Sequence, residues 1–215
     1  MIKIEKTDVY GWETAIRGMR NPMNSWDKSD TIFESKCSCD DVGCGQTCFV
    51  GDNDLSLMKK LVKAGSDHRK FMRFITVSAD ITAPLYWWKE YDTYKIGTVA
   101  NSCSTMHKIH AKEFTLDDFS LEHCVNEPLV MSIFDYTLCM LNEAREKYVE
   151  TKDKDFWWHI IQLLPSSYNQ KRTVLLNYEV LRNMYHSRKA HKLDEWRDFC
   201  KWIETLPYHK LITEE

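Results

Sequence analysis

The alternation of apolar and polar positions predicts an α+β fold in which helices outnumber strands. Apolar residues indicate a short first strand within residues 1–10, and a helix over Trp12–Arg20 that ends before Asn21-Pro22. A partly blurred alternation predicts a strand over 71–78, covered on both faces. Further helices are expected at 55–64, 82–95, 132–150, 155–164, 171–187 and 193–205. These elements indicate one helix-rich domain without internal repeats.

The segment 165–197 carries the clearest amphipathic pattern. On a helical wheel of about 100° per residue centred on Asn177, one side is apolar. That side carries Val174, Val180, Leu181, Met184 and Tyr185. Asn177 sits in the middle of this face, and Arg188 returns to about 20° on the same wheel. Burying an amide or a guanidinium requires a partner. Two interpretations are open: both groups brace a neighbouring element, or they face a polar, anionic ligand.

Four cysteines lie close together in a long segment without periodicity, residues 21–54. They are Cys37, Cys39, Cys44 and Cys48, within CSCDDVGCGQTC. Four thiolates at this spacing suit one structural zinc ion in a tetrahedral site. The alternative is a set of four reduced cysteines on a loop. In either case we expect no catalytic role for them.

Composition narrows the class of protein. The chain has 215 residues, a formal charge of −3 and 43% hydrophobic residues. That length suits one sizeable core, and no basic surplus points to nucleic acid. No run of eighteen apolar residues and no signal-peptide pattern are present, so we expect a cytoplasmic protein without a membrane segment. Phosphate-loop and dinucleotide-binding glycine motifs are also missing from the sequence.

Several residues in the middle of the chain are candidates for a site. His68 lies at a helix–strand junction, where a histidine is either structural or functional. The predicted helix 82–95 carries an aromatic belt that suits a core, an interface or the flank of a planar ring. The small polar run after it contains Asn101 and Ser104, which suit a ligand-facing loop or an ordinary turn. Ser104 lacks the Gly-x-Ser-x-Gly context of a serine hydrolase.

The spacing of polar residues after Leu164-Pro165 matches a known family. The matching residues are Asn177, Asn183, Arg188, His191 and Glu195. Two Asn six apart, an Arg five later, and a following His and Glu resemble the flavin-dependent thymidylate synthases, also called thymidylate synthase complementing proteins. Upstream, Gly65, His68, and the Asn101/Ser104 pair follow the same order. The resemblance covers residues 54–205 in outline and is specific in the last third.

The resemblance implies a function, a fold and a set of partners. That family converts dUMP to dTMP with methylenetetrahydrofolate as carbon donor and reduced FAD as hydride carrier, regenerated with NADPH. It implies a central, mostly antiparallel sheet within one domain of residues 1–215, with a Cys-rich insertion at about 34–50. It also implies a homotetramer with active sites between subunits.

The resemblance also assigns roles to residues of this chain. Asn177 and Asn183 would contact the flavin nucleotide, and His68 would lie beside the flavin. Arg188 would hold the pyrimidine nucleotide and stabilise charge on its ring. Ser104, with Asn101 near it, would lie at the substrate.

The chain departs from the family at its defining Arg-His-Arg triplet. Lys89-Glu90-Tyr91 stand there. Lys89 keeps one positive charge without the fork of a guanidinium, while Glu90 would repel a phosphate. Three functions are therefore open: a flavin-dependent enzyme acting on a uracil nucleotide, a nucleotide-binding or assembly protein that has lost flavin catalysis, and a zinc-stapled interaction module centred on residues 37–48.

Overall fold

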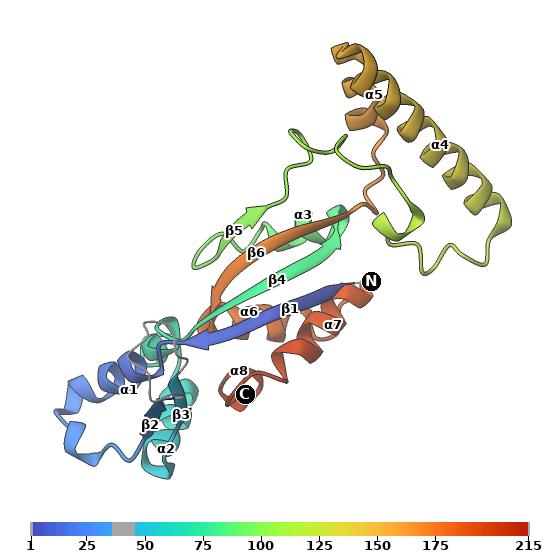
Figure 1. Cartoon of the computed structure of the whole chain (residues 1–215). Coiled ribbons are helices and arrows are strands. Elements are labelled where there is room, and N and C mark those ends of the chain that lie inside the picture. Colours follow the sequence, from blue (N-terminus) through green and yellow to red (C-terminus); the bar gives the residue numbers. More distant parts are fainter. Residues whose placement is uncertain (1, 36–45, 215) are drawn as a thin grey trace.

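A four-stranded antiparallel sheet forms the centre of the protein. The computed structural model describes residues 2–35 and 46–214. The strand order in the sheet is β1-β4-β6-β5, and every neighbouring pair is antiparallel. The strands are β1 (Lys3–Tyr10), β4 (Thr76–Pro84), β6 (Asn169–Asn177) and β5 (Val99–Ser102). Figure 1 shows the three long strands β1, β4 and β6 running side by side along the length of the molecule.

The apolar positions of β4 explain why one face of this sheet is buried. Val77, Ala79 and Ile81 alternate with half-buried Ser78 and Asp80 along the strand. Successive side chains of a strand point to opposite faces, so the apolar set faces the core as a group. The neighbouring strand β6 contributes further buried residues, such as Leu176, which lies opposite Val77.

Helices and their aromatic residues fill the main core. These helices are α3 (Leu85–Tyr91), α6 (Tyr178–Arg188), α7 (Asp194–Ile203) and α8 (Lys210–Thr213). Trp87 and Trp88 of α3 and Trp196 of α7 are almost fully buried, and the rings of Trp87 and Trp196 lie 4.9 Å apart. The aromatic belt expected from the sequence is therefore part of the core. Each such ring stabilises the fold through the large apolar area that it removes from water.

Smaller elements gather at one end of the sheet. They are α1 (Trp12–Arg20), the short 3₁₀ turns η1 (Asn21–Met23) and η2 (Trp26–Lys28), the hairpin β2 (Ile32–Ser35) and β3 (Gln46–Phe49), α2 (Asp52–Lys63) and η3 (Arg69–Arg73). Asp54 holds this end together, because its fully buried carboxylate accepts hydrogen bonds from Arg20 at 2.6 Å and Ser29 at 2.7 Å. Removing one partner of such a buried pair typically costs about 3–5 kcal/mol.

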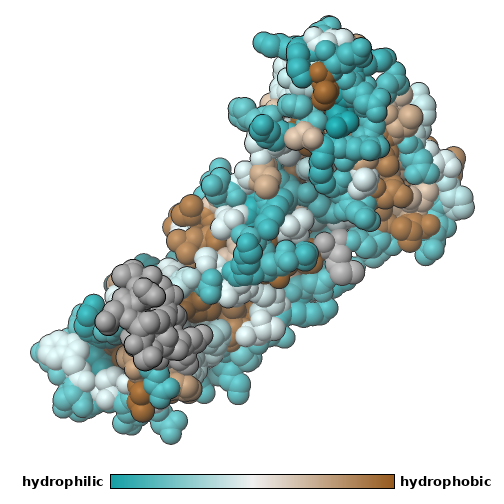
Figure 2. Space-filling model, in the orientation of Figure 1, coloured by the Kyte–Doolittle hydropathy of each residue, from teal (hydrophilic) through white to brown (hydrophobic). Residues whose placement is uncertain are grey.

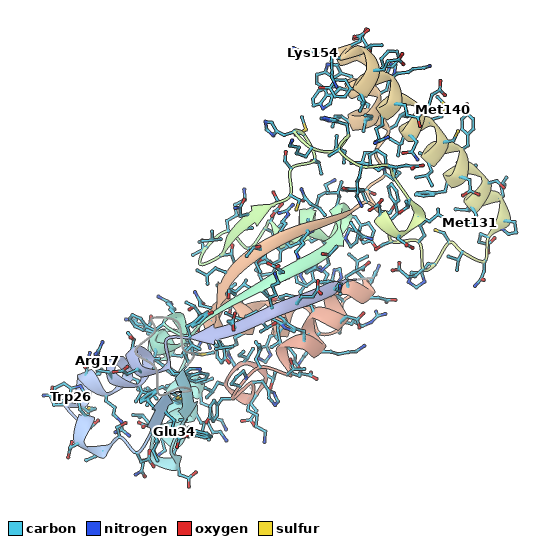
Figure 3. The ribbon with its side chains drawn as sticks, viewed as in Figure 1. Arg17, Trp26, Glu34, Met131, Met140 and Lys154 are labelled. Atoms are coloured by element: carbon cyan, nitrogen blue, oxygen red, sulfur yellow. The ribbon has the colours of Figure 1, made fainter. Side chains whose placement is uncertain are left out.

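A helical arm projects from the opposite end. It consists of α4 (Pro128–Thr151) and α5 (Lys154–Leu163), and the turn η4 (Leu116–Asp118) precedes it. A second hydrophobic cluster holds the arm together, made of Ile109, Phe114, Phe119, Leu141, Ala144 and Ile160. Figure 3 shows Met131 and Met140 along α4, at the far end of the molecule from Arg17 and Trp26.

The helix-rich α+β fold with an antiparallel sheet expected from the sequence is confirmed. The predicted helix 171–187 is wrong in its first half, because residues 169–177 form strand β6 and only residues 178–188 are helical. The predicted strand 71–78 is also wrong at its start, which is the turn η3. The predicted helix 82–95 shortens to α3, since β4 continues through Pro84 to pair with Asn169.

Candidate functional site

Asn177 lies at the junction between β6 and α6. It is the last residue of the strand, opposite Thr76, and the N-cap of the helix, with extended backbone angles of φ −130° and ψ 164°. Its Oδ1 accepts a hydrogen bond from the backbone N–H of Val180 at 3.0 Å. Asparagine is a preferred N-cap because its side chain satisfies one of the unpaired N–H groups of the first helical turn. The carbonyl oxygen of the amide is therefore satisfied by the backbone.

A glycine brings a loop close to the amide nitrogen of Asn177. Gly97 has φ +79°, a conformation that favours glycine, and a Cβ built on it would lie 3.0 Å from Asn177 Nδ2. The same Cβ would lie 2.9 Å from Cγ2 of Val180. The connection between α3 and β5 thus packs directly against the start of α6.

Arg188 is the last residue of α6, and its guanidinium joins α6 to α3 and α7. Its Nη1 donates to Oε2 of Glu90 at 2.9 Å, and its Nε donates to the hydroxyl of Tyr94 at 3.0 Å. The guanidinium carbon lies 4.9 Å from the ring centre of Trp196, a distance typical of a cation–π contact. Arg188 thus finds its partners within the chain, as the interpretation of this residue as a brace between neighbouring elements expected.

The carboxylate of Glu90 receives more than one donor. Its Oε2 also accepts a hydrogen bond from the indole N–H of Trp196 at 2.9 Å, and Nε2 of His191 lies 3.4 Å away. The side chains of Glu90 and Arg188 are 35% and 20% exposed, so water screens their attraction in part. We refer to Glu90, Tyr94, Arg188, His191 and Trp196 as the Arg188 cluster.

A cavity of about 200 Å³ lies beside the start of α7. Its lining includes Tyr86, Glu122, His123, Lys192, Glu195 and Asp198. The hydroxyl of Tyr86 donates to Oε1 of Glu195, which is buried. Burial, and then the hydrogen bond to the Glu195 carboxylate, raise the pKa of Tyr86. The phenol therefore stays protonated at neutral pH and holds the carboxylate in place.

The other predicted flavin contacts lie on the surface. Asn183 is exposed on α6, Lys89 is exposed on α3, and His68 is exposed just before η3. Arg69, next to His68, donates to buried Glu179 at the start of α6 at 2.9 Å. This ion pair places the His68 turn beside the same helix that carries Asn183.

The predicted substrate residues Asn101 and Ser104 belong to the β5 end of the sheet. Asn101 is exposed and pairs with Thr173 of β6. The Ser104 hydroxyl accepts from the backbone N–H of His107 at 2.9 Å and lies 2.9 Å from Nδ1 of the same residue. Ser104 thus caps a turn, as one of its two interpretations expected. Among the described residues, no hydrogen bond joins Arg188 to Ser104, Asn177 or His68.

The sequence analysis did not identify three of the partners of Arg188: Glu90, Tyr94 and Trp196. Glu90 carried a signal, because an acidic residue at the centre of a triplet that is basic in the family suits an arginine nearby. No sequence signal marked Tyr94 or Trp196, which lie 94 and 8 positions from Arg188. Their contacts with the arginine depend on how α3 and α7 pack.

The predicted zinc site remains a prediction. Cys37, Cys39 and Cys44 lie outside the described residues, and Cys48 is half-buried in β3. Burial raises the pKa of the Cys48 thiol to about 11. In residues 2–35 and 46–214, no three His, Cys, Asp or Glu side chains gather in a way that would hold a metal ion. None of the helices within these ranges has the length and apolarity needed to cross a bilayer.

Two solved structures with the same fold are of a thymidylate synthase with FAD and dUMP. No protein-family model and no curated protein matches the sequence. A structure of thymidylate synthase X (ThyX) from Helicobacter pylori with FAD and dUMP is 15% identical and has a TM-score of 0.72. The match covers 100% of this chain and 98% of that chain. A second ThyX complex with FAD and dUMP from the same organism is 16% identical, with a TM-score of 0.69 over 99% and 98% of the two chains. The resemblance found in the sequence is thereby confirmed at the level of the fold, which is that of flavin-dependent thymidylate synthases.

Proposed function

We propose that this protein binds FAD and a uracil nucleotide and catalyses flavin-dependent methylation of that nucleotide, the conversion of dUMP to dTMP. The observation that carries the proposal is the match over nearly the full length of two chains whose structures contain both FAD and dUMP. Methylenetetrahydrofolate would supply the carbon, and NADPH would regenerate the reduced flavin. Reduced FAD, when bound, would supply the hydride.

In this proposal Arg188 holds the nucleotide and stabilises negative charge on the uracil ring. Its support is the fixed orientation of the guanidinium, which Tyr94 and the ring of Trp196 hold from two sides. A guanidinium held in advance loses little entropy when it binds a phosphate or a developing anion. Ser104 and Asn101 would contact the substrate from the β5 side.

The described residues fit a flavin in part. The exposed side chains of Asn183, His68 and Lys89 would contact the cofactor, and Lys89 would supply a positive charge for its diphosphate. Asn177 would contribute its amide nitrogen only, since its oxygen caps α6. The fit is poorer around α3, where Glu90 stands in place of the triplet's histidine and Tyr91 in place of its second arginine.

A second candidate function is nucleotide binding or assembly on the same scaffold without flavin catalysis. The contact between Glu90 and Arg188 favours this second function, because the guanidinium already binds a carboxylate at 2.9 Å. Loss of two arginines from the family triplet removes charge that the flavin and nucleotide phosphates would need.

We also propose that the chain forms a homotetramer with its sites between subunits. Support for a contact between two copies comes from α4, which exposes Leu129, Ile133 and Tyr136 by 74%, 62% and 68%. These residues lie within about 60° of one another on the helix. Figure 2 shows hydrophobic residues gathered on the arm. Antiparallel pairing of two copies about Ile133 would set Leu129 of one chain against Tyr136 of the other, a closed two-fold contact.

Two measurements test the enzymatic proposal. The purified protein should be yellow, or should take up added FAD, and the gene should restore growth of a thymidine-requiring bacterial strain without thymidine. The Arg188→Ala variant is the matched control and should fail to restore growth. A protein that takes up no FAD yet is stabilised thermally by dUMP would support the second candidate instead.

A further inference from the structure

Side-chain nitrogens from three parts of the chain converge on the Glu90 carboxylate. They are Nη1 of Arg188 at the end of α6, Nε2 of His191 in the following turn, and Nε1 of Trp196 in α7. We propose that Glu90 is a resident anion, which occupies the ligand position of the Arg188 cluster and must move away before the nucleotide binds there. This inference rests on the proposed nucleotide site at Arg188 and adds its regulation.

The donors are fixed independently of Glu90. Trp196 is fully buried and packs edge-on against Phe199 at 5.7 Å between ring centres. The Nε of Arg188 is held by Tyr94, while its guanidinium lies over the Trp196 ring. A buried indole N–H needs an acceptor, and a guanidinium favours a phosphate or carboxylate. The cluster therefore has the character of an anion site even when its own carboxylate is removed.

The Glu90 side chain is able to leave without unfolding α3. It lies in the last turn of that helix and is 35% exposed. The backbone of the turn is held separately, because the Glu90 carbonyl accepts from the N–H of Thr93 at 3.1 Å and from its hydroxyl at 2.7 Å. A partly exposed ion pair is weak because water screens it, whereas a phosphate brings up to two negative charges. An incoming phosphate can thus compete for Arg188.

A neighbouring ion pair provides a matched control. The carboxylate of Asp92 accepts from Nη1 of Arg172 at 2.8 Å, and that guanidinium lies 4.2 Å from the ring centre of Trp88. The arrangement of carboxylate, arginine and tryptophan is the same, two residues along the chain. Asp92→Asn therefore removes a comparable charge without touching the Arg188 cluster.

The test compares binding of dUMP, inorganic phosphate and deoxyuridine by calorimetry to the wild type, Glu90→Gln and Asp92→Asn. Glutamine keeps an acceptor for Trp196 and removes the charge. We expect Glu90→Gln to bind dUMP at least about tenfold more tightly, a gain of about 1.4 kcal/mol. A matching gain for deoxyuridine places the uracil ring at the Arg188 cluster, and a matching gain for inorganic phosphate places the nucleotide phosphate there. Asp92→Asn should bind all three as the wild type does. Adding Arg188→Ala to Glu90→Gln should abolish the gain.

Two results would contradict the proposal that Glu90 is a resident anion. One is an affinity for dUMP that is unchanged or lower in Glu90→Gln and in a second variant, Glu90→Ala, with both variants folded by circular dichroism. The other is an equal gain in Asp92→Asn, which would indicate a general charge effect. A wild type that methylates dUMP while its Glu90 variants bind as before overturns this inference alone. An inactive, flavin-free wild type whose Glu90→Gln variant gains dUMP affinity supports it and contradicts the enzymatic proposal.

Discussion

The side-chain oxygen of Asn177 caps helix α6 by accepting the backbone N–H of Val180 at 3.0 Å. This relationship gives Asn177 a structural role that exists without any ligand. A proposed flavin contact must therefore come from its amide nitrogen, which lies beside Gly97. The two roles use different atoms, so two substitutions separate them.

We expect Asn177→Ala to lower the free energy of unfolding by about 1 kcal/mol, because the cap is lost. Asn177→Asp should keep the stability of the wild type, since aspartate caps equally well and its charge favours the helix N-terminus. Urea unfolding measures both effects. Both variants should bind FAD more weakly, because neither has the amide N–H. An Asn177→Asp protein with wild-type FAD affinity would leave Asn177 with the cap as its one role.

For Arg188 we expect a loss of nucleotide binding that is larger than the loss of stability. Arg188→Ala should weaken dUMP binding at least about 100-fold, or about 2.7 kcal/mol. Its unfolding free energy should fall by no more than about 1 kcal/mol, because the ion pair with Glu90 is partly exposed. Calorimetric titration and thermal unfolding of the same samples provide both values.

Arg188→Lys is the control for charge alone. Lysine keeps the positive charge but loses the planar fork that contacts both Glu90 and Tyr94. Its dUMP affinity should lie between those of the wild type and Arg188→Ala. Unchanged dUMP affinity in Arg188→Ala would remove this residue from the proposed nucleotide site.

The sequence predicted the element types well where a pattern was local. The helix Trp12–Arg20 was predicted with its observed bounds. The pattern failed at residues 171–177, because Val174 fits the apolar stripe of the helical wheel, while Val174 and Leu176, two positions apart, fit the buried face of a strand. Pairing with β4 decides between them, and that pairing joins residues about 90 positions apart. The preference of Asn177 for an N-cap was the local signal for the true start of the helix.

The same difference between local patterns and long-range packing applies to the candidate site. The helical wheel singled out Asn177 and Arg188 as polar groups that need partners, and both have them, although Asn177 precedes the helix as its N-cap. The identity of those partners depended on how α3 and α7 pack beside α6, which no short-range pattern encodes. The resemblance to a family supplied the fold, while the substitution at Glu90 marked where this chain differs from it.

Two half-buried, hydrogen-bonded tyrosines predict a loss of stability at alkaline pH. A hydrogen bond to Glu204, and then burial, raise the pKa of Tyr185 to about 12, and burial with Glu195 raises that of Tyr86. Both values exceed the value of about 10 in the unfolded chain. A group whose pKa is higher in the folded state stabilises it fully below pH 10, and this contribution is lost as the pH rises toward 12.

Urea unfolding of the wild type and of Tyr185→Phe between pH 8 and pH 12 measures this dependence. The free energy of unfolding should fall less steeply above pH 10 in the variant, because one titrating group is gone. Tyr86→Phe should show the same shallower slope, and also a lower stability at pH 7, since buried Glu195 loses its donor. Equal slopes for all three proteins would contradict the assignment of these tyrosines.

The exposed stripe of α4 predicts which substitution separates the subunits. Ile133→Asp places a charge at the centre of the proposed two-fold contact, so we expect smaller assemblies than the wild type forms in analytical ultracentrifugation. Val149→Asp is the control, because Val149 is 44% exposed on the same helix and lies about 160° from Ile133. It should assemble as the wild type does. If both variants keep the assembly state of the wild type, α4 is not the contact. If both lose it, the effect comes from added charge on the arm.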